Sequence, residues 1–339
     1  MQFHEHVPLA PYTTFRIGGP ARWFAEAATE ADILEAVEFA RARSLPLFPL
    51  GGGSNLLVAD AGFPGLVLHV ALKGIEQQKD TFQVAAGESW DDFVSHAVER
   101  DFAGIECLAG IPGTVGGTPI QNVGAYGQEV SEAIIRVRAL HLATLKFEEF
   151  SNANCGFSYR RSIFNTTERG KYIVTRVMYR LHPNGQPKIA YADLKRHFEG
   201  CAAPSLREVS DAVRAIRRGK GMYIVPGDPD CRSAGSFFKN PIVSAEHYDR
   251  IAAQEGTDVP HYPAADAAVK IPAAWLLERA GFRKGYALGE AGISTRHTLA
   301  LVNRGSAKAA DIFALRDRII AEVESRFGIR LEPEPVLLG

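Results

Sequence analysis

Two polar side chains, Arg160 and Ser236, have neighbours that could place them in a partly buried site. Arg160 follows Phe157-Ser158-Tyr159, and a guanidinium half-buried among such residues needs a carboxylate or phosphate, which it binds through two parallel hydrogen bonds. The alternative is that Arg160 and Arg161 are both solvated. Ser236 precedes Phe237-Phe238 outside any G-x-S-x-G hydrolase turn, and such a serine is by itself more often structural. The residues alone therefore leave both roles open.

Two carboxylates, Glu332 and Glu334, stand two residues apart near the end of the chain. If this segment is extended, their side chains share one face and could act on the same ligand. A solvated chain end is the alternative. The apolar residues 336–338 that follow favour a packed segment, although its prolines restrict it to an edge strand.

A glycine-rich turn lies between two apolar runs, residues 45–50 and 56–58, and reads Gly51-Gly52-Gly53-Ser54-Asn55-Leu56. Consecutive glycines cost folding entropy, but they accept positive φ angles and close approach by a ligand. Successive N–H groups in such a turn converge on an anion, which predicts a phosphate cradle for a nucleotide cofactor. A flexible surface turn is the alternative, which the flanking apolar runs disfavour. No GxxxxGK[ST] string occurs, and Leu56 stands where a Rossmann fingerprint needs glycine, so neither common phosphate motif fits.

A second glycine-rich stretch spans residues 109–127 and reads AGIPGTVGGTPIQNVGAYG. Its six glycines are interleaved with small and apolar residues, a pattern typical of buried backbone that packs against a ligand. We therefore expect the cofactor to lie between the two glycine-rich stretches.

Capping signatures and apolar periodicity predict the elements that position these stretches. Helices are expected to begin after Thr29, Ser89 and Ser205, and an apolar stripe from Ile312 to Phe327 predicts a long final helix. The elements group into three expected domains: residues 1–70 completed by residues 329–339, residues 71–224, and residues 225–328.

The totals allow two or three compact units, since 46% of the 339 residues are hydrophobic. A net charge of −1 gives no reason to expect binding to nucleic acid or to an anionic membrane. The four cysteines show no zinc spacing, and we expect no bound metal. We also expect no signal peptide and no membrane span. These features predict a soluble, cytoplasmic protein whose partners are small molecules. We also expect a monomer, which the composition itself does not determine.

The motifs GGGSNLL and PGTVGGTPIQNVGAYG resemble the FAD-binding half of vanillyl-alcohol-oxidase-type flavoproteins, and within these the UDP-N-acetylenolpyruvoylglucosamine reductase, or MurB, family. The resemblance runs from residues 14–19 to Glu334, and AGSFFKNP at 234–241 matches the family motif position by position. It implies an α+β fold, with two α+β FAD-binding domains of this type and a third α+β substrate-binding domain. By the same resemblance, FAD is held by Gly51, Gly52, Gly53, Ser54, Asn55, Leu56, Pro112, Gly113, Thr114, Gly116, Gly117, Gly124 and Ile173.

The resemblance also implies three catalytic residues. A motif like YR-x-SIF supplies an arginine, here Arg160, AGSFFKNP supplies Ser236, and a motif like LEPEV supplies Glu334. Pro335 departs from that last motif and leaves Glu332 as an alternative. The implied reaction reduces FAD with NADPH and then transfers hydride to C3 of the enolpyruvyl group of UDP-N-acetylglucosamine enolpyruvate. Ser236 would protonate C2, while Arg160 and Glu334 stabilise the developing charge, giving UDP-N-acetylmuramate for peptidoglycan synthesis.

Further residues are implied to contact the substrate. Tyr191, within IAYADL, resembles the substrate-covering tyrosine of the family class that has an extra loop, and Tyr126, Asn240 and His297 match other substrate contacts. Some relatives place a lysine on the diphosphate shortly before the serine motif, and the role of Lys220 is open. Two other hypotheses are a different FAD-dependent oxidase or dehydrogenase on this scaffold, and a non-catalytic protein that binds nucleotide sugars.

Overall fold

The computed structural model describes residues 1–201, 203–256 and 258–339, and the chain divides into two compact units. The first unit comprises Met1–Val7, Pro20–Gly53 and Phe63–Gly219, and the second comprises Pro8–Gly19, Ser54–Gly62 and Lys220–Gly339. The first glycine-rich turn crosses from one unit to the other after Gly53. The three-domain boundaries expected from the sequence stay a prediction.

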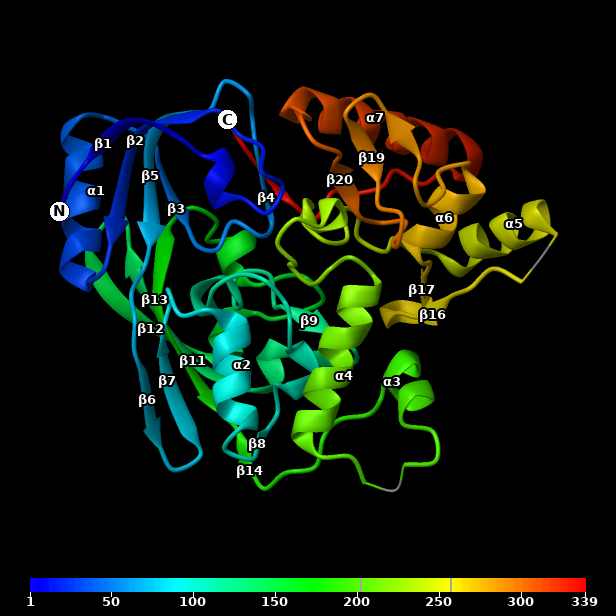
Figure 1. The fold of residues 1–339 in the computed structure, drawn as a ribbon, viewed down its shortest axis with the longest axis horizontal. Coiled ribbons are helices and arrows are strands. Elements are labelled where there is room, and N and C mark those ends of the chain that lie inside the picture. Colours follow the sequence, from blue (N-terminus) through cyan, green and yellow to red (C-terminus); the bar gives the residue numbers. More distant parts are fainter. Residues whose placement is uncertain (202, 257) are drawn as a thin grey trace. The chain divides into compact units, whose positions relative to one another are not determined.

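The first unit contains a four-stranded sheet in the order β1-β2-β5-β3, in which both β2 and β3 run parallel to β5 (Figure 1). Its strands are β1 (His4–Pro8), β2 (Pro20–Ala27), β5 (Phe63–Val70) and β3 (Leu47–Leu50). Helix α1 (Glu30–Ala42) buries Ile33, Ala36, Val37 and Ala40 in the core of this unit. Its capping box is present, because Thr29 accepts from the Asp32 N–H while Asp32 accepts from the Thr29 N–H.

A five-stranded antiparallel sheet completes the core of the first unit, in the order β12-β11-β13-β7-β6. Its strands are β12 (Lys146–Ser151), β11 (Ile134–His141), β13 (Tyr172–Arg180), β7 (Thr81–Ala85) and β6 (Ile75–Gln78). Helices α2 (Trp90–Val98) and α4 (Leu206–Gly219) begin where the Ser89 and Ser205 caps predict, and α3 (Ala192–His197) precedes α4. Two short strand pairs join β8 (Phe102–Ala103) to β14 (His182–Pro183), and β9 (Gly124–Ala125) to β10 (Gln128–Glu129).

The second unit is built around helix α7 (Ala309–Phe327), whose predicted apolar stripe is buried. Gly328 ends this helix with a φ of 64°, a left-handed conformation that glycine adopts without a Cβ penalty. Strands β4 (Leu56–Val58) and β21 (Val336–Leu338) pair in parallel, so the end of the chain lies beside residues from its first part. The other elements are β15 (Ile242–Val243), α5 (Ala245–Glu255), β16 (Tyr262–Pro263), β17 (Val269–Lys270), α6 (Ala273–Arg279), β18 (Ala287–Leu288), β19 (Ala291–Ile293) and β20 (Leu301–Asn303).

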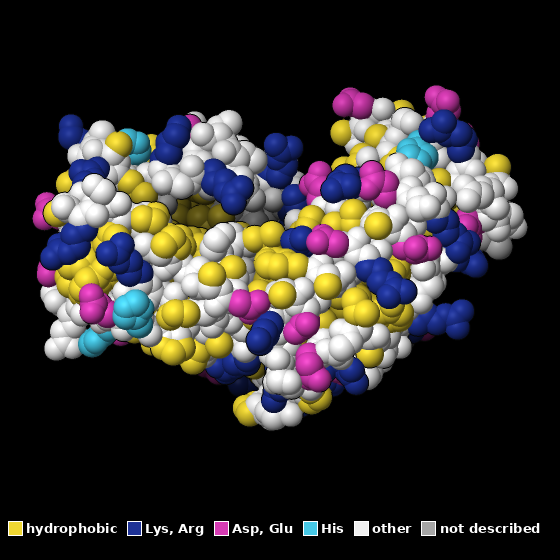
Figure 2. Space-filling model, turned by 90° about the horizontal axis from the view of Figure 1, so that it is seen from above, with side chains coloured by type: hydrophobic (Ala, Val, Ile, Leu, Met, Phe, Trp, Pro, Cys, Tyr) yellow, Lys and Arg dark blue, Asp and Glu magenta, His cyan; other side chains and the backbone are white. Residues whose placement is uncertain are grey.

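On the face drawn in Figure 2, acidic and basic side chains are interspersed, in keeping with the net charge of −1. Within the described ranges, no helix has the length and apolar character needed to cross a membrane.

Candidate active site

The two glycine-rich stretches meet backbone to backbone in the first unit. A Cβ added to Gly52 would lie 2.7 Å from Gly113 Cα, and one added to Gly51 would lie 2.6 Å from Thr114 Oγ1. Gly53 and Gly113 have φ angles of 60° and 129°, which side chains rarely tolerate. The turn is therefore packed against other backbone, unlike a flexible surface loop.

These residues fit a phosphate-bearing cofactor such as FAD, because bare backbone at two touching turns lets N–H groups approach an anion closely. Gly116 packs against Ala86, where an added Cβ would lie 2.6 Å from the Ala86 Cβ. Ile173 lies in β13 and is buried in the core. The expected cofactor residues of the first unit are Gly51, Gly52, Gly53, Pro112, Gly113, Thr114, Gly116, Gly117, Gly124 and Ile173.

The rest of the expected cofactor set, Ser54, Asn55 and Leu56, belongs to the second unit. There, Thr14 Oγ1 donates to the Ser54 carbonyl at 3.4 Å, and Leu56 is buried in β4. Asn55 Nδ2 donates to the Glu334 carbonyl at 3.3 Å. This contact holds the end of the turn against the segment that carries the candidate glutamate.

Arg160 lies in a tight turn of the first unit with a φ of 56°. This left-handed conformation is costly for arginine, and such strain persists only where surrounding bonds maintain it. Asn165 Nδ2 donates to the Arg160 carbonyl at 3.0 Å, and Arg160 Nη2 donates to the Gly124 carbonyl at 2.9 Å. The guanidinium is thereby attached to the second glycine-rich stretch.

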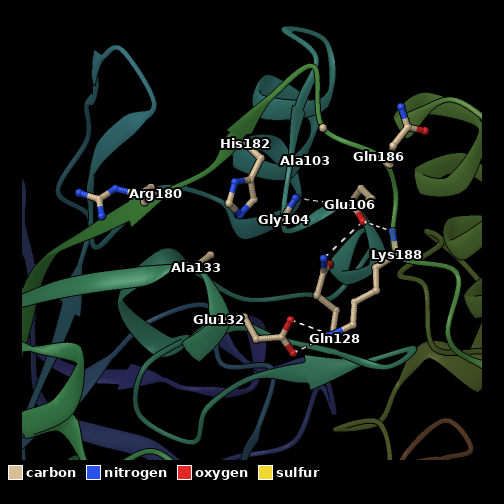
Figure 3. Close-up of a pocket in the computed structure, with 11 residues that line it drawn as sticks. Ala103, Gly104, Glu106, Gln128, Glu132, Ala133, Arg180, His182, Gln186 and Lys188 are labelled. Carbon is tan, nitrogen blue, oxygen red and sulfur yellow. Dashed lines mark hydrogen bonds and ion pairs between the residues drawn. The ribbon is translucent and has the colours of Figure 1, made fainter.

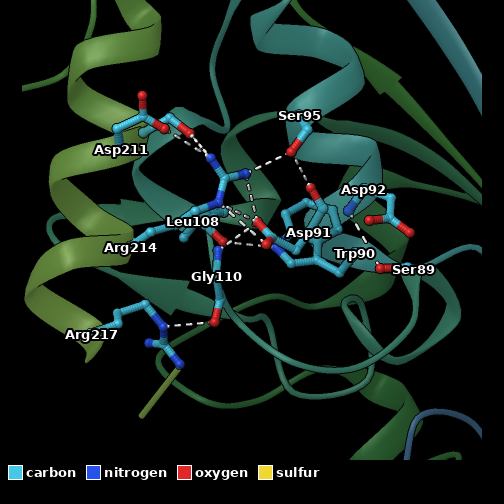
Figure 4. A network of polar contacts seen from close by, with 11 residues as sticks. Ser89, Trp90, Asp91, Asp92, Ser95, Leu108, Gly110, Asp211, Arg214 and Arg217 are labelled. Carbon is cyan, nitrogen blue, oxygen red and sulfur yellow. Dashed lines mark hydrogen bonds and ion pairs between the residues drawn. The ribbon is translucent and has the colours of Figure 1, made fainter. Parts of the chain in front are cut away.

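Tyr126 and Tyr191 meet edge to face, with ring centroids 5.4 Å apart and an interplanar angle of 83°. Tyr126 has a φ of 50°, and Tyr191 is the N-cap residue of α3. Arg217 of α4 is buried, and its Nε donates to the Gly110 carbonyl at 2.8 Å (Figure 4). Burial lowers the pKa of Arg217, while the hydrogen bond with Tyr126 opposes this shift. A buried cation thus supports both Tyr126 and the second glycine-rich stretch.

In the second unit, the segments that carry Ser236 and Glu334 pair with each other. Phe238 and Pro333 form an antiparallel bridge, and the Glu334 N–H donates to the Phe237 carbonyl at 2.8 Å. The other glutamate, Glu332, has a side chain that is 75% exposed and lies 3.2 Å from Lys239 Nζ. Glu334 is partly buried, whereas Glu332 faces solvent.

Two expected substrate residues of the second unit already have structural contacts. Asn240 Oδ1 accepts from the Ala273 N–H at 2.9 Å, at the start of α6. His297 Nδ1 accepts from the Leu299 N–H at 3.2 Å. The turn before His297 is held by Arg296, whose guanidinium contacts both Asp228 and Asp230. If Asn240 or His297 contacts the substrate, it does so with a side chain that hydrogen bonds within the protein already hold in place.

Comparison with known proteins decides the family. A family model described as the C-terminal domain of UDP-N-acetylenolpyruvoylglucosamine reductase matches residues 228–338, and an FAD binding domain model matches residues 21–144. The UDP-N-acetylenolpyruvoylglucosamine reductase of Thermobifida fusca is 46% identical, covering 99% of this chain and 98% of its own. The chain belongs to the UDP-N-acetylenolpyruvoylglucosamine reductase (MurB) family. The Streptomyces coelicolor enzyme is also 46% identical, covering 100% of this chain and 90% of its own.

The fold agrees with a solved member of the family. The crystal structure of MurB from Thermus caldophilus superposes with a TM-score of 0.69 at 27% identity and covers 100% of both chains. The family, the FAD-binding region and an FAD-dependent reductase are therefore confirmed as predicted. The roles of single residues stay predictions.

The sequence reasoning did not single out Asn122, which is fully buried in the second glycine-rich stretch. Its Nδ2 donates to Glu129 Oε2 at 2.7 Å and to the Ser158 carbonyl at 3.1 Å, while its Oδ1 accepts from Ser131 N–H. It connects the stretch to the turn that contains Arg160. In the sequence, Asn122 is recognisable only as a polar amide within a run of small and apolar residues. A surface turn would show the same pattern.

Proposed function

We propose that this chain reduces the enolpyruvyl group of UDP-N-acetylglucosamine enolpyruvate with NADPH, forming UDP-N-acetylmuramate for peptidoglycan synthesis. The observation that carries the proposal is the pairing of the Ser236 segment with the Glu334 segment in the second unit. This pairing brings together a hydroxyl-bearing and a carboxyl-bearing segment, which suits the delivery of a proton to a carbon next to a carboxylate.

FAD would lie on the glycine cradle, contacting Gly51–Gly53 and Pro112–Thr114, with Ser54–Leu56 completing the cofactor site. When bound, FAD supplies the redox chemistry, accepting hydride from NADPH and delivering it to C3 of the enolpyruvyl group. The close packing of Gly52 on Gly113 supports this placement, because a Cβ at Gly52 would collide with the Gly113 backbone and force the two turns of the cradle apart.

Ser236 would donate its hydroxyl proton to C2 as a general acid. Serine is normally a weak acid, so this role requires a strongly basic acceptor and a fixed hydroxyl. Arg160 would pair with the substrate carboxylate, and Glu334 would stabilise the charge that develops there as a neutral acid or hydrogen-bond partner. The exposed ion pair of Glu332 with Lys239 supports Glu334 as the functional glutamate.

Tyr191 would cover the bound substrate, as in the family class with a tyrosine loop, and its contact with Tyr126 supports this assignment. Asn240 and His297 would contact the nucleotide sugar, and Lys220 is a candidate for its diphosphate. We assign residues 1–70 with 329–339 and residues 71–224 to two FAD-binding domains of the vanillyl-alcohol-oxidase type, and residues 225–328 to substrate binding. The enzyme would act in the cytoplasm as a monomer.

A stopped-flow absorbance experiment on the FAD-loaded protein tests this proposal. NADPH added without air should bleach the flavin band, and UDP-N-acetylglucosamine enolpyruvate added next should restore it. UDP-N-acetylglucosamine, which lacks the enolpyruvyl group, is the matched control and should restore nothing. Bleaching without recovery on the enolpyruvyl substrate would instead indicate a flavin enzyme with another electron acceptor.

A further inference from the structure

Lys188, three residues before Tyr191, is held at both of its backbone polar groups by two adjacent buried residues. Its N–H donates to Glu106 Oε1 at 2.9 Å, and its carbonyl accepts from Cys107 Sγ at 3.0 Å. Glu106 and Cys107 belong to a short 3-10 helix, Glu106–Leu108, in the first unit. Figure 3 shows the Glu106 carboxylate facing the Lys188 N–H. The side chains of Glu106 and Cys107 thus hold the backbone of Lys188 from one short helix. We call these two hydrogen bonds the grip.

The Glu106 carboxylate is unusual because only 1% of the residue is exposed. A buried carboxylate is stable only when hydrogen bonds replace its water. Besides the Lys188 N–H, it accepts from the Gly104 N–H at 2.8 Å and from Gln128 Nε2 at 3.3 Å. Gly104 is two residues from Glu106, whereas Gln128 and Lys188 come from segments that are distant in the sequence. The carboxylate therefore joins the Tyr191 segment to its own segment and to Gln128.

Cys107 makes the second half of the grip. Burial, and then the neighbouring Glu106 carboxylate, raise the pKa of the Cys107 thiol, which keeps the S–H that the bond to Lys188 requires. The Cys107 N–H also donates to Gln128 Oε1 at 3.0 Å. Gln128 is thus bonded to both residues of the grip.

The same Gln128 stands two residues after Tyr126, so the grip and the tyrosine pair share one turn. A Cβ added to Gly127 would lie 3.3 Å from the Ala190 Cβ, which shows how closely the Tyr191 segment lies on this turn. A cavity of about 270 Å³, lined by Gly104, Glu106, Gln128 and Lys188 among others, borders the grip. On the side of this cavity side chains do not fill the space, so polar bonds hold the segment there, while Ala190 packs on the Tyr126 turn.

We propose that Glu106 and Cys107 are positioning residues that hold Lys188 and thereby set Tyr191 against Tyr126. They would tighten the hold on the nucleotide-sugar substrate without touching it. This inference rests on the role of Tyr191 under the proposed function. It gives a function to the buried Glu106 carboxylate and the buried Cys107 thiol, which take no part in the chemical steps of the reaction.

Hydrogen exchange of residues 186–191 in the FAD-loaded enzyme tests the grip directly. Cys107→Ala removes the donor to Lys188, whereas Cys107→Ser keeps one in a similar volume. Exchange should accelerate about three- to tenfold in Cys107→Ala, as expected for one lost hydrogen bond, and return towards the parent rate in Cys107→Ser. Glu106→Gln should accelerate exchange at least as much, because it replaces one carboxylate oxygen, an acceptor, with an N–H₂ group that faces an N–H donor. Exchange in α4 should stay unchanged in the alanine variant.

Glu132→Gln is the matched control, because Glu132 contacts the same lysine through the exposed Lys188 Nζ, at 2.7 Å. Exposed ion pairs contribute little, so exchange should change less than about twofold. Unchanged exchange in both Cys107→Ala and Glu106→Gln would overturn the proposal. Equal acceleration in α4 would also overturn it, because the effect would then be general destabilisation.

Steady-state kinetics test the consequence for substrate. In Cys107→Ala the KM for UDP-N-acetylglucosamine enolpyruvate should rise about three- to tenfold, while kcat and flavin reduction by NADPH stay within about twofold. Faster exchange with an unchanged KM would overturn the positioning role. If the parent enzyme did not turn over this substrate, the proposed function would fail instead, while the exchange results would still report on the grip.

Discussion

Asp91 of α2 and Arg214 of α4 form an ion pair that also holds the second glycine-rich stretch. Arg214 Nη2 lies 2.8 Å from Asp91 Oδ1, and the same oxygen accepts from the Gly110 N–H at 2.6 Å (Figure 4). Arg214 also donates to Ser95 and Ser210 at 2.7 Å each. One guanidinium and one carboxylate therefore join two helices to the start of the expected cofactor cradle.

We expect Asp91→Asn to lower the free energy of unfolding by about 1–3 kcal/mol. The reason is that the partly buried hydrogen bonds of Asp91 would no longer have a charged carboxylate as acceptor. Urea denaturation of the FAD-free protein measures this. The control is Glu149→Gln, which breaks an exposed pair with Arg136 whose side chains are 53% and 43% exposed. That variant should lose less than about 1 kcal/mol, and equal losses would contradict a special role for Asp91.

Gly52→Val should weaken FAD binding at least about tenfold, because the new Cβ has no free space. A strain of about 1.4 kcal/mol is enough for a tenfold change in affinity. It would lie 2.7 Å from Gly113 Cα, which is backbone and cannot rotate away. The measurement is flavin absorbance per protein after purification and after titration with FAD. Gly219→Ala, where an added Cβ meets no described atom within 4 Å, is the control. A Gly52→Val enzyme with a full complement of FAD would exclude the cradle.

Ser236→Ala should slow reoxidation of the flavin by the enolpyruvyl substrate about 10²- to 10⁴-fold, the usual contribution of a general acid. Flavin reduction by NADPH should be unaffected, because the hydroxyl acts only in the second half-reaction. Single-turnover stopped-flow measurements separate the two steps. Ser233→Ala is the control, because within the described residues Ser233 Oγ makes a single hydrogen bond, which it accepts from the Gly235 N–H at 3.3 Å. Equal slowing of both half-reactions by Ser236→Ala would reject the proton-donor role.

Glu334→Gln and Glu332→Gln distinguish the two carboxylates. We expect the first to lower kcat about 10²- to 10³-fold, as loss of a group that stabilises transition-state charge does. The second should leave kcat nearly unchanged, because Glu332 makes an exposed pair with Lys239. If the order of the two effects were reversed, the catalytic role would move to Glu332.

Asp230 makes the second unit sensitive to acid. Burial would raise the pKa of Asp230, but hydrogen bonds from Thr295 and Arg296 outweigh it, and the net pKa is lowered from 3.8. The lowered pKa contributes stability that is present above the unfolded-state value and is lost as the pH falls through the folded-state value. Asp230→Asn should therefore be less stable than the parent at neutral pH, and the difference should shrink below pH 3.8. Urea midpoints across this range measure it, and a constant difference would contradict the assignment.

Much of the local structure was readable from the sequence. The caps at Thr29, Ser89 and Ser205 and the glycine end of α7 appear as predicted, because these bonds join residues within a few positions of each other. The family was also readable, because its long motifs are contiguous. The close backbone packing of the glycine turn also agrees with its sequence, since consecutive glycines indicate close approach by backbone or ligand, and its role in holding FAD stays a prediction.

The contacts that support the site were decided only by the tertiary structure. Arg214 meets Asp91 across 123 positions of sequence, and Lys188 meets Glu106 across 82. No local pattern distinguishes Glu106, Asn122 or Arg217 from solvated polar residues, because their roles depend on which distant segments fold against them. A buried polar group is stable only with partners, and the fold alone determines which partners are within reach.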